Sequence, residues 1–123
     1  MAVQSIRGYA VPVKSLYRLA KQVPPPDKEY LTNLDRRGAP RDELPQHIKD
    51  SWDALSAFDS EEAARAAGVN STRNLGKRIV RYDIPDDASV TCVFTPEIAN
   101  GHYDIRGDKD EIKRNYVGVV GSV

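Results

Sequence analysis

The sequence predicts an α+β domain in which a mostly antiparallel sheet is combined with short helices. Several segments alternate apolar and polar residues with the two-residue period of strands, most clearly residues 79 to 84 and 102 to 106. Short helical patterns lie irregularly between these segments, and the sequence contains no repeat or low-complexity stretch. A chain of 123 residues fits one domain, residues 1 to 123, with a single hydrophobic core.

The N-terminal part predicts two extended segments. Residues 9 to 13 alternate as an edge strand would, and Pro12 argues against a central position because proline cannot donate a ladder hydrogen bond. Residues 16 to 19 form a better strand, in which Tyr17 shares a face with Leu19. The prolines at positions 24 to 26 then keep the chain extended and end this unit.

Two short helices are expected next. Asp27 caps the first, which ends before residues 38 to 40. Its apolar positions at helical spacing are Tyr30, Leu31 and Leu34. Ile48 and Trp52 are four residues apart, so they would lie on one side of a second helix.

The middle of the chain predicts a strand followed by a helix. Residues 55 to 58 can form a short strand, and Asp59 with Glu62 makes an N-terminal capping arrangement. The alanines that follow favour helix strongly, and Gly68 is the expected end of that helix.

Two further strands are expected at residues 79 to 84 and 90 to 94. A tight acidic turn at residues 85 to 87 separates them. Because so short a turn brings neighbouring strands together, we expect these two to pair as a hairpin.

The strand expected at residues 102 to 106 has polar side chains on one face and apolar or aromatic side chains on the other. Its period places His102, Asp104 and Arg106 on one face, while Tyr103 and Ile105 point the other way. Polar side chains gathered on one face in this manner make the strand the first place to look for function.

A helix and a last strand complete the expected fold. Asp108, with Glu111 three residues later, is the capping pair that opens the helix. Residues 116 to 120 are almost entirely apolar, which predicts a last strand, placed centrally if both of its faces are buried.

Composition excludes several classes of function. The 18 basic residues balance 18 acidic ones, so no long-range field draws the protein toward nucleic acid or an anionic membrane. No signal-peptide core and no stretch near ~20 apolar residues occurs, so we expect a cytoplasmic protein that does not enter a membrane. The single Cys92 excludes an internal disulfide and a cysteine-based zinc site.

Three segments carry a resemblance to known proteins. They are Leu16-Tyr17-Arg18-Leu19, the stretch from Trp52 to Ala64, and the stretch from Gly101 to Asp108. Together they look like a group of small bacterial proteins and, more distantly, like the ADP-ribosyltransferase superfamily. In that superfamily an Arg or His on the first strand, a Ser-containing strand followed by a helix, and a late Glu line a cleft in a split sheet that holds NAD.

The resemblance implies a split sheet and a site for NAD or a related nucleotide. Arg18 matches the first-strand residue and would clamp the pyrophosphate, and Ser56 matches the serine before the helix. Tyr82 or Tyr103 would supply an aromatic wall for nicotinamide. The residues expected to bind the cofactor are therefore Tyr17, Arg18, Ser56 and Tyr82.

The implied activity is ADP-ribosyl transfer, as in a toxin or a phage-defence or counter-defence effector. His102 is a candidate general base. No Glu-x-Glu pair occurs at the late strand, so the carboxylate would be Glu97 or Glu111. The catalytic residues expected are His102, Tyr103 and Glu111. No metal is expected, because the spacing of His102, Asp104 and Asp108 matches no calcium or zinc motif.

Other interpretations stay open. Arg18 can equally be a strand arginine paired with a surface acid, and Ser56 can simply mark the passage from strand to helix. A non-catalytic protein-binding module, such as an antitoxin, immunity or phage-related protein, would use the charged segment of residues 35 to 50 and an exposed sheet edge. The residues of a metal-independent RNase toxin would be His102, Tyr103 and Arg106.

Overall fold

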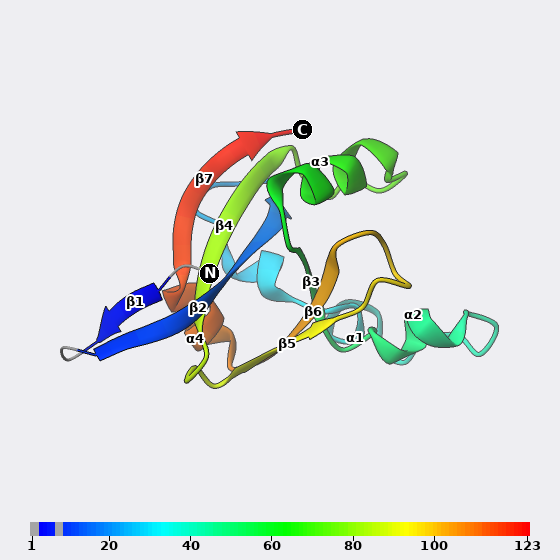
Figure 1. The fold of residues 1–123 in the computed structure, drawn as a ribbon. Coiled ribbons are helices and arrows are strands. Elements are labelled where there is room, and N and C mark those ends of the chain that lie inside the picture. The colour runs from blue at the N-terminus through cyan, green and yellow to red at the C-terminus, as the bar shows by residue number, and fades with distance from the viewer. Residues whose placement is uncertain (1–2, 7–8) are drawn as a thin grey trace.

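Six antiparallel strands form the sheet at the centre of the molecule, in the order β5-β6-β3-β2-β4-β7 (Figure 1). The computed structural model describes residues 3–6 and 9–123, with side chains from residue 13 onward. The six strands are β2 (Tyr9–Ala20), β3 (Leu55–Phe58), β4 (Arg78–Pro85), β5 (Val90–Phe94), β6 (His102–Gly107) and β7 (Tyr116–Ser122). β1 (Val3–Ile6) pairs with the first half of β2.

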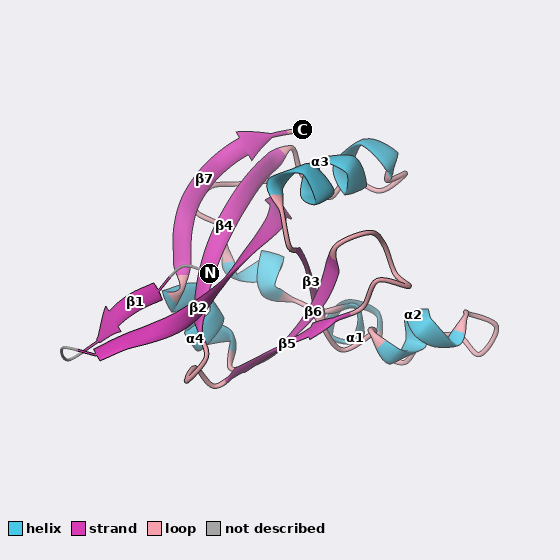
Figure 2. Ribbon diagram, in the orientation of Figure 1, coloured by secondary structure: helices cyan, strands magenta, loops and turns pink. Residues whose placement is uncertain are grey.

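The helices are short and are spread around the sheet (Figure 2). They are the 3₁₀ helix η1 (Asp27–Tyr30) and the α-helices α1 (Asn33–Arg37), α2 (Gln46–Asp50), α3 (Glu61–Asn70) and α4 (Lys109–Arg114). The α+β class with an antiparallel sheet is thus confirmed.

The sheet divides into two halves that meet at one point. β2 pairs with β4 in continuous register from Val13 to Ala20, whereas β2 and β3 share the single registered pair Tyr17 and Phe58. β3, β6 and β5 therefore form one half, and β2, β4 and β7 form the other. We call the junction between β2 and β3 the seam.

Apolar side chains are buried on both faces of the sheet. On one face, Tyr30 of η1 and Ile112 of α4 join strand residues such as Leu16 and Tyr82 in the larger cluster. We call this the η1 face. On the other, the α3 face, Ala64 of α3 packs with Phe58 and Ile79. Neighbouring residues of β2 therefore face different clusters.

The expected hairpin between residues 79 to 84 and 90 to 94 is wrong. β4 pairs with β2 and β7, and β5 pairs with β6. The intervening turn, in which the Ala88 N–H bonds the Pro85 carbonyl at 3.0 Å, carries the chain from one half of the sheet to the other. Because β2 and β7 pair with the two edges of β4, neither edge is available to β5, even though only a short turn separates β4 from β5.

The last strand is confirmed, and it lies at an edge of the sheet because the condition for a central position, burial of both faces, is not met. β7 pairs with β4, and Val117 and Val119 remain 55% and 42% exposed. The apolar run reflects the preference of β-branched residues for extended backbone. This preference holds in a strand whether or not both of its faces are buried.

The predicted strands at residues 9 to 13 and 16 to 19 are one continuous strand, β2, in the centre of the sheet. Pro12 lies opposite Val3 of β1, just before the pairing with β4 begins at Val13. The proline is therefore tolerated because it precedes the central part of the strand.

Helix starts differ from the expectation at two places. The helix expected from Asp27 is divided into η1 and α1, and Thr32, not Asp27, supplies the side-chain cap by pairing with Asp35 in a capping box. At α3 the cap is Ser60 instead of Asp59, since the Ser60 hydroxyl accepts the Ala63 N–H at 3.1 Å. Leu31 and Leu34 stay exposed, so of the predicted apolar stripe Tyr30 alone is buried.

The helix start at Asp108 is confirmed. The Asp108 carboxylate accepts the Asp110 N–H at 2.9 Å, and α4 follows. Ile112 is the residue of this helix that enters the core.

Candidate functional site

The polar face of β6 is the centre of the candidate site. His102 Nδ1 lies 3.8 Å from Asp104 Oδ1, and Asp104 Oδ2 lies 3.7 Å from Arg106 Nη1. Ile105 is buried in the core on the opposite face, and Tyr103 packs against the same cluster. The predicted separation of polar and apolar residues along this strand is confirmed.

Both ring nitrogens of His102 are hydrogen-bonded although the residue is only 2% exposed. Nδ1 lies 2.7 Å from the Thr95 hydroxyl, and Nε2 lies 3.0 Å from the Ser56 hydroxyl. The Phe58 ring packs edge-on against the imidazole with the ring centroids 5.4 Å apart. Ser56 itself is exposed, so a buried imidazole lies directly behind an accessible hydroxyl.

Burial lowers the pKa of His102, because an apolar environment disfavours the imidazolium. The carboxylates of Asp104 and Glu97 act in the opposite direction with smaller effect. His102 is therefore neutral at neutral pH, with one ring nitrogen free to accept a proton.

A second set of polar contacts holds this arrangement in place. Asp104 is 3% exposed and accepts a hydrogen bond from the Ser51 hydroxyl at 2.7 Å. Arg106 bonds the Asp53 carboxylate at 2.8 Å and the Asp50 carbonyl at 2.7 Å. The hydrogen bond from Arg106 lowers the pKa of Asp53 and keeps it ionised. The segment around α2 is thereby tied to β6.

Arg18 lies at the seam, where β2 and β3 part. Its Nε donates to the Ser56 carbonyl at 2.9 Å, and its Nη2 donates to the Glu29 carbonyl at 3.1 Å. The guanidinium also lies over the Tyr30 ring at 5.6 Å from the centroid. Because β2 leaves β3 at this point, the Ser56 carbonyl would lose a ladder partner, and Arg18 replaces it.

Arg18 and the Ser56 hydroxyl leave the seam on different faces. Arg18 is two residues from Leu16 on β2, so both point to the η1 face. Ser56 is two residues from Phe58 on β3, so both point to the α3 face. Arg18 thus meets the backbone of Ser56, while His102 meets its side chain. The structure brings the side chains of Ser56 and His102 into hydrogen-bond contact. Arg18 is connected to this pair through its hydrogen bond to the Ser56 backbone carbonyl.

Of the other two expected cofactor-binding residues, Tyr17 lies at the seam and Tyr82 lies away from it. Tyr82 is 0% exposed, and its hydroxyl lies 2.7 Å from that of Tyr30, so it has no ring face left for a ligand. Burial raises the pKa of the Tyr82 hydroxyl. Tyr17 is half-buried against the Phe58 cluster on the α3 face.

The three expected catalytic residues do not share one position. Tyr103 projects to the face opposite His102, and its hydroxyl accepts a hydrogen bond from Lys14 at 3.3 Å. Glu111, on α4, is engaged by Arg114. The imidazole of His102 is 2% exposed and lies directly behind the Ser56 hydroxyl.

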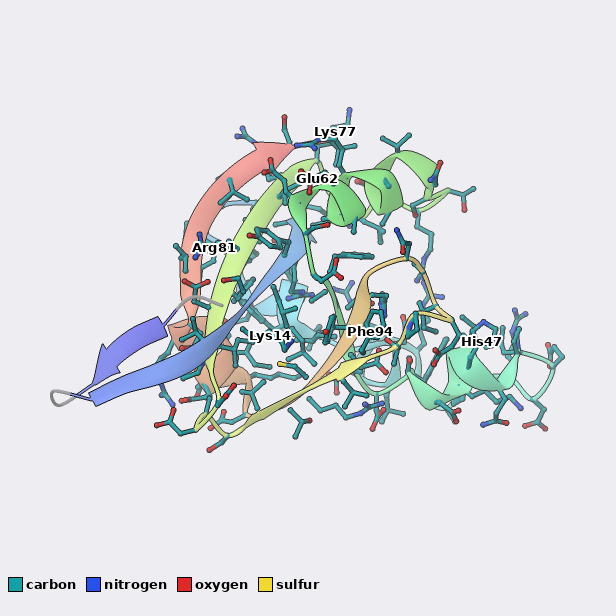
Figure 3. The ribbon with its side chains drawn as sticks, viewed as in Figure 1. Lys14, His47, Glu62, Lys77, Arg81 and Phe94 are labelled. Atoms are coloured by element: carbon teal, nitrogen blue, oxygen red, sulfur yellow. The ribbon has the colours of Figure 1, made fainter. Side chains whose placement is uncertain are left out.

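An aromatic pair next to a cation lies on the η1 face. The rings of Phe94 and Tyr103 are 5.2 Å apart, and Lys14 Nζ lies 4.7 Å from the Tyr103 centroid. Lys14 and Phe94 project from β2 and β5 in Figure 3. Phe94 is half exposed, which leaves part of its ring open to a flat ligand.

Sequence reasoning missed Thr95 and Ser51. Thr95 follows β5 and pairs with His102, with its N–H 2.8 Å from the His102 carbonyl, whereas Ser51 comes from the end of α2. The pairing of β5 with β6 would have indicated Thr95 once the strand order was known. No local pattern marks Ser51 as a partner of Asp104.

A cavity of about 160 Å³ lies apart from His102 and Ser56. It is lined by residues of α1, β3, β6 and α4 and their flanks, among them Leu34, Asp35, Leu55, Ile105, Lys109 and Ile112. Ligand pockets usually measure roughly 300 to 1,000 Å³, so this cavity is too small for NAD.

Two further properties concern only the described residues. Within 3–6 and 9–123, no three His, Cys, Asp or Glu side chains gather so as to hold a metal ion. In the same part of the chain, no helix has the length and apolar character needed to cross a membrane.

Fold and site together define a small α+β protein with an exposed serine backed by a buried histidine. Comparison with protein-family models, curated proteins and solved structures finds no match for this chain.

Proposed function

We propose that the chain is a cytoplasmic ADP-ribosyltransferase-like domain that binds NAD or a related nucleotide at the seam between β2 and β3. The observation that carries this proposal is the bond between Arg18 Nε and the Ser56 carbonyl, 2.9 Å long, at the point where the two central strands diverge. Arg18, which matches the arginine of the resemblance, and Ser56, which matches the serine before the helix, are two of the three features that would line the cleft.

Each residue has a distinct role in this proposal. Arg18 is a positioning residue, because it fixes the Ser56 carbonyl and the Glu29 carbonyl with two of the five N–H donors of its guanidinium. The Ser56 hydroxyl, held by His102, is the group that contacts the sugar of the ligand. The ring of Phe94 beside Tyr103 and Lys14 lies on the opposite face of the sheet from the Ser56 hydroxyl, so it is not part of this site.

Isothermal titration calorimetry with NAD and ADP-ribose tests the proposal. We expect both to bind the wild-type protein and to bind Ser56→Ala about fivefold more weakly, because one hydrogen bond of about 1 kcal/mol is lost. Arg18→Lys should also weaken binding, since an ammonium cannot bridge two carbonyls as the planar guanidinium does.

The matched control is Arg81→Lys, on the neighbouring strand β4 (Figure 3). Arg81 forms an ion pair with Asp83 and makes no hydrogen bond to Ser56. Its replacement should therefore leave ligand binding unchanged. No binding by the wild-type protein, or equal binding by all four proteins, contradicts the proposal.

The edge strand β7 supports a second candidate function, protein binding. Residues 116 to 123 have no charged side chain, and Val117, Val119 and Val120 are exposed. Within the described residues no further strand pairs with the outer side of β7. Arg65 bonds the Ser122 carbonyl at 3.2 Å, and the rest of this edge leaves backbone donors and acceptors for a strand of another protein.

Light scattering after size exclusion tests this candidate with a second copy of the chain as the simplest partner. If the edge binds a strand, the wild-type protein should form a dimer that Val119→Lys converts to a monomer. Thr91→Lys on the opposite edge strand β5 is the control. A wild-type protein that stays monomeric at high concentration contradicts self-association through β7.

A further inference from the structure

The contact between Ser56 and His102 has the geometry of a nucleophile and its base. Ser56 Oγ lies 3.0 Å from His102 Nε2, within the roughly 2.6 to 3.2 Å that proton transfer requires. Ser56 is exposed and His102 is 2% exposed, so the hydroxyl is presented to solvent while the imidazole stays behind it.

The hydrogen bonds around His102 favour a proton on Nδ1. Thr95 Oγ1 lies 2.7 Å from Nδ1 and also donates to the His102 carbonyl at 3.3 Å. A hydroxyl has one proton, so when that proton goes to the carbonyl, Nδ1 must be the donor in the contact with Thr95. Asp104 Oδ1, 3.8 Å from Nδ1, favours the same tautomer because its charge attracts an N–H.

Nε2 is then the unprotonated nitrogen, and it accepts the proton of the Ser56 hydroxyl. The ring cannot turn away, because Thr95 holds Nδ1 and the Phe58 ring packs against the imidazole edge-on. A base oriented by a third group behind an exposed hydroxyl is the arrangement that activates serine for attack.

From this geometry we propose that Ser56 is an activated nucleophile that accepts acyl groups from esters of small carboxylic acids, with His102 as its general base. In the first step a bond forms between Ser56 Oγ and the ester carbonyl carbon, and the Oγ proton passes to His102 Nε2. The bond from that carbon to the ester oxygen then breaks, and the proton on Nε2 passes to the departing alcohol. Water attacks the acylated serine by the reverse proton route and releases the acid.

This inference goes beyond nucleotide binding and does not depend on it. Binding at the seam uses the Ser56 hydroxyl only as a hydrogen-bonding group, whereas acyl transfer requires the tautomer described above. Either proposal can therefore fail while the other stands.

p-Nitrophenyl acetate is the probe of choice, with release of p-nitrophenol and peptide mapping as readouts. We expect a burst of about one p-nitrophenol per chain and an acetyl group on Ser56. Both should be lost in Ser56→Ala, and the burst rate should fall about 100-fold or more in His102→Gln, because general-base catalysis contributes roughly 10² to 10⁴. The control is Ser122→Ala, at another exposed serine, which should behave as the wild type.

A second variant keeps the test valid if His102→Gln fails to fold. Ser56→Cys leaves His102 in place, and a thiol beside a neutral imidazole should react with iodoacetamide near neutral pH about tenfold faster than Ser122→Cys at its own site. Absence of acetyl on Ser56 in the folded wild-type protein overturns the proposal. Equal alkylation rates at the two cysteines also overturn it.

Discussion

Acidification from about pH 7.5 to about pH 5.5 is expected to destabilise the protein through His102. Burial lowers the pKa of His102 in the folded chain below the ordinary value of 6.5 that applies after unfolding. Across this range the unfolded chain therefore binds a proton that the folded chain does not bind. Stability contributed by the neutral imidazole is full above the unfolded pKa and is lost as the pH falls toward the folded pKa.

The size of the effect follows from linkage. A proton bound only by the unfolded chain changes the free energy of unfolding by about 1.4 kcal/mol per pH unit. Over the two units considered, the unfolded imidazole passes from about one-tenth to about nine-tenths protonated, so the loss reaches about 1.4 kcal/mol when His102 stays neutral in the folded state throughout.

Urea denaturation at several pH values measures this loss. His102→Gln should show a smaller decrease in the free energy of unfolding, because glutamine keeps hydrogen-bonding capacity without titrating. His47→Gln removes the other histidine, on α2, and should keep the wild-type decrease. Equal decreases in the wild-type protein and His102→Gln would refute the argument that burial excludes the proton.

Three further predictions concern stability and are checked by urea denaturation. Tyr82→Phe should cost about 1 to 3 kcal/mol by leaving the buried Tyr30 hydroxyl without its partner, and the double variant with Tyr30→Phe should cost no more than the single one. Ser60→Ala removes the cap of α3 and should cost about 1 kcal/mol. Gly76→Ala should cost more than about 1 kcal/mol, because φ is +97° there and a Cβ would collide with the backbone of Ala20; a smaller loss would mean that the loop gives way.

Local features were predictable from the sequence. The alternation from His102 to Arg106 correctly placed polar and apolar side chains on opposite faces, because the direction of a side chain in a strand depends only on its position. Asp108 likewise opens α4, since a cap acts on the backbone two or three residues away.

Pairings between distant segments were not predictable in the same way. The alternation within β4 is equally compatible with a neighbour before or after it, and the choice of β2 and β7 over β5 depends on how both faces of the sheet are covered. For the apolar β7, the sequence does not distinguish a central position from an edge, because strand propensity and burial produce the same pattern of residues.

The candidate site was predictable in part. Ser56 and His102 were chosen from the sequence for different roles, and their contact depends on the register that pairs β3 with β6. Tyr82 was expected to face a ligand, but Tyr30 of η1 packs over it and buries it. A polar tyrosine on a strand gives no indication of what will pack above it.

Binding of a nucleotide at the seam can be tested by amide chemical-shift mapping with ADP-ribose. We expect the largest changes at the amides of Tyr17, Arg18, Ser56 and Ala57, which lie on the two strands at their point of divergence. Changes confined to β7 or to the residues around the small cavity, or none at millimolar ligand, would contradict it.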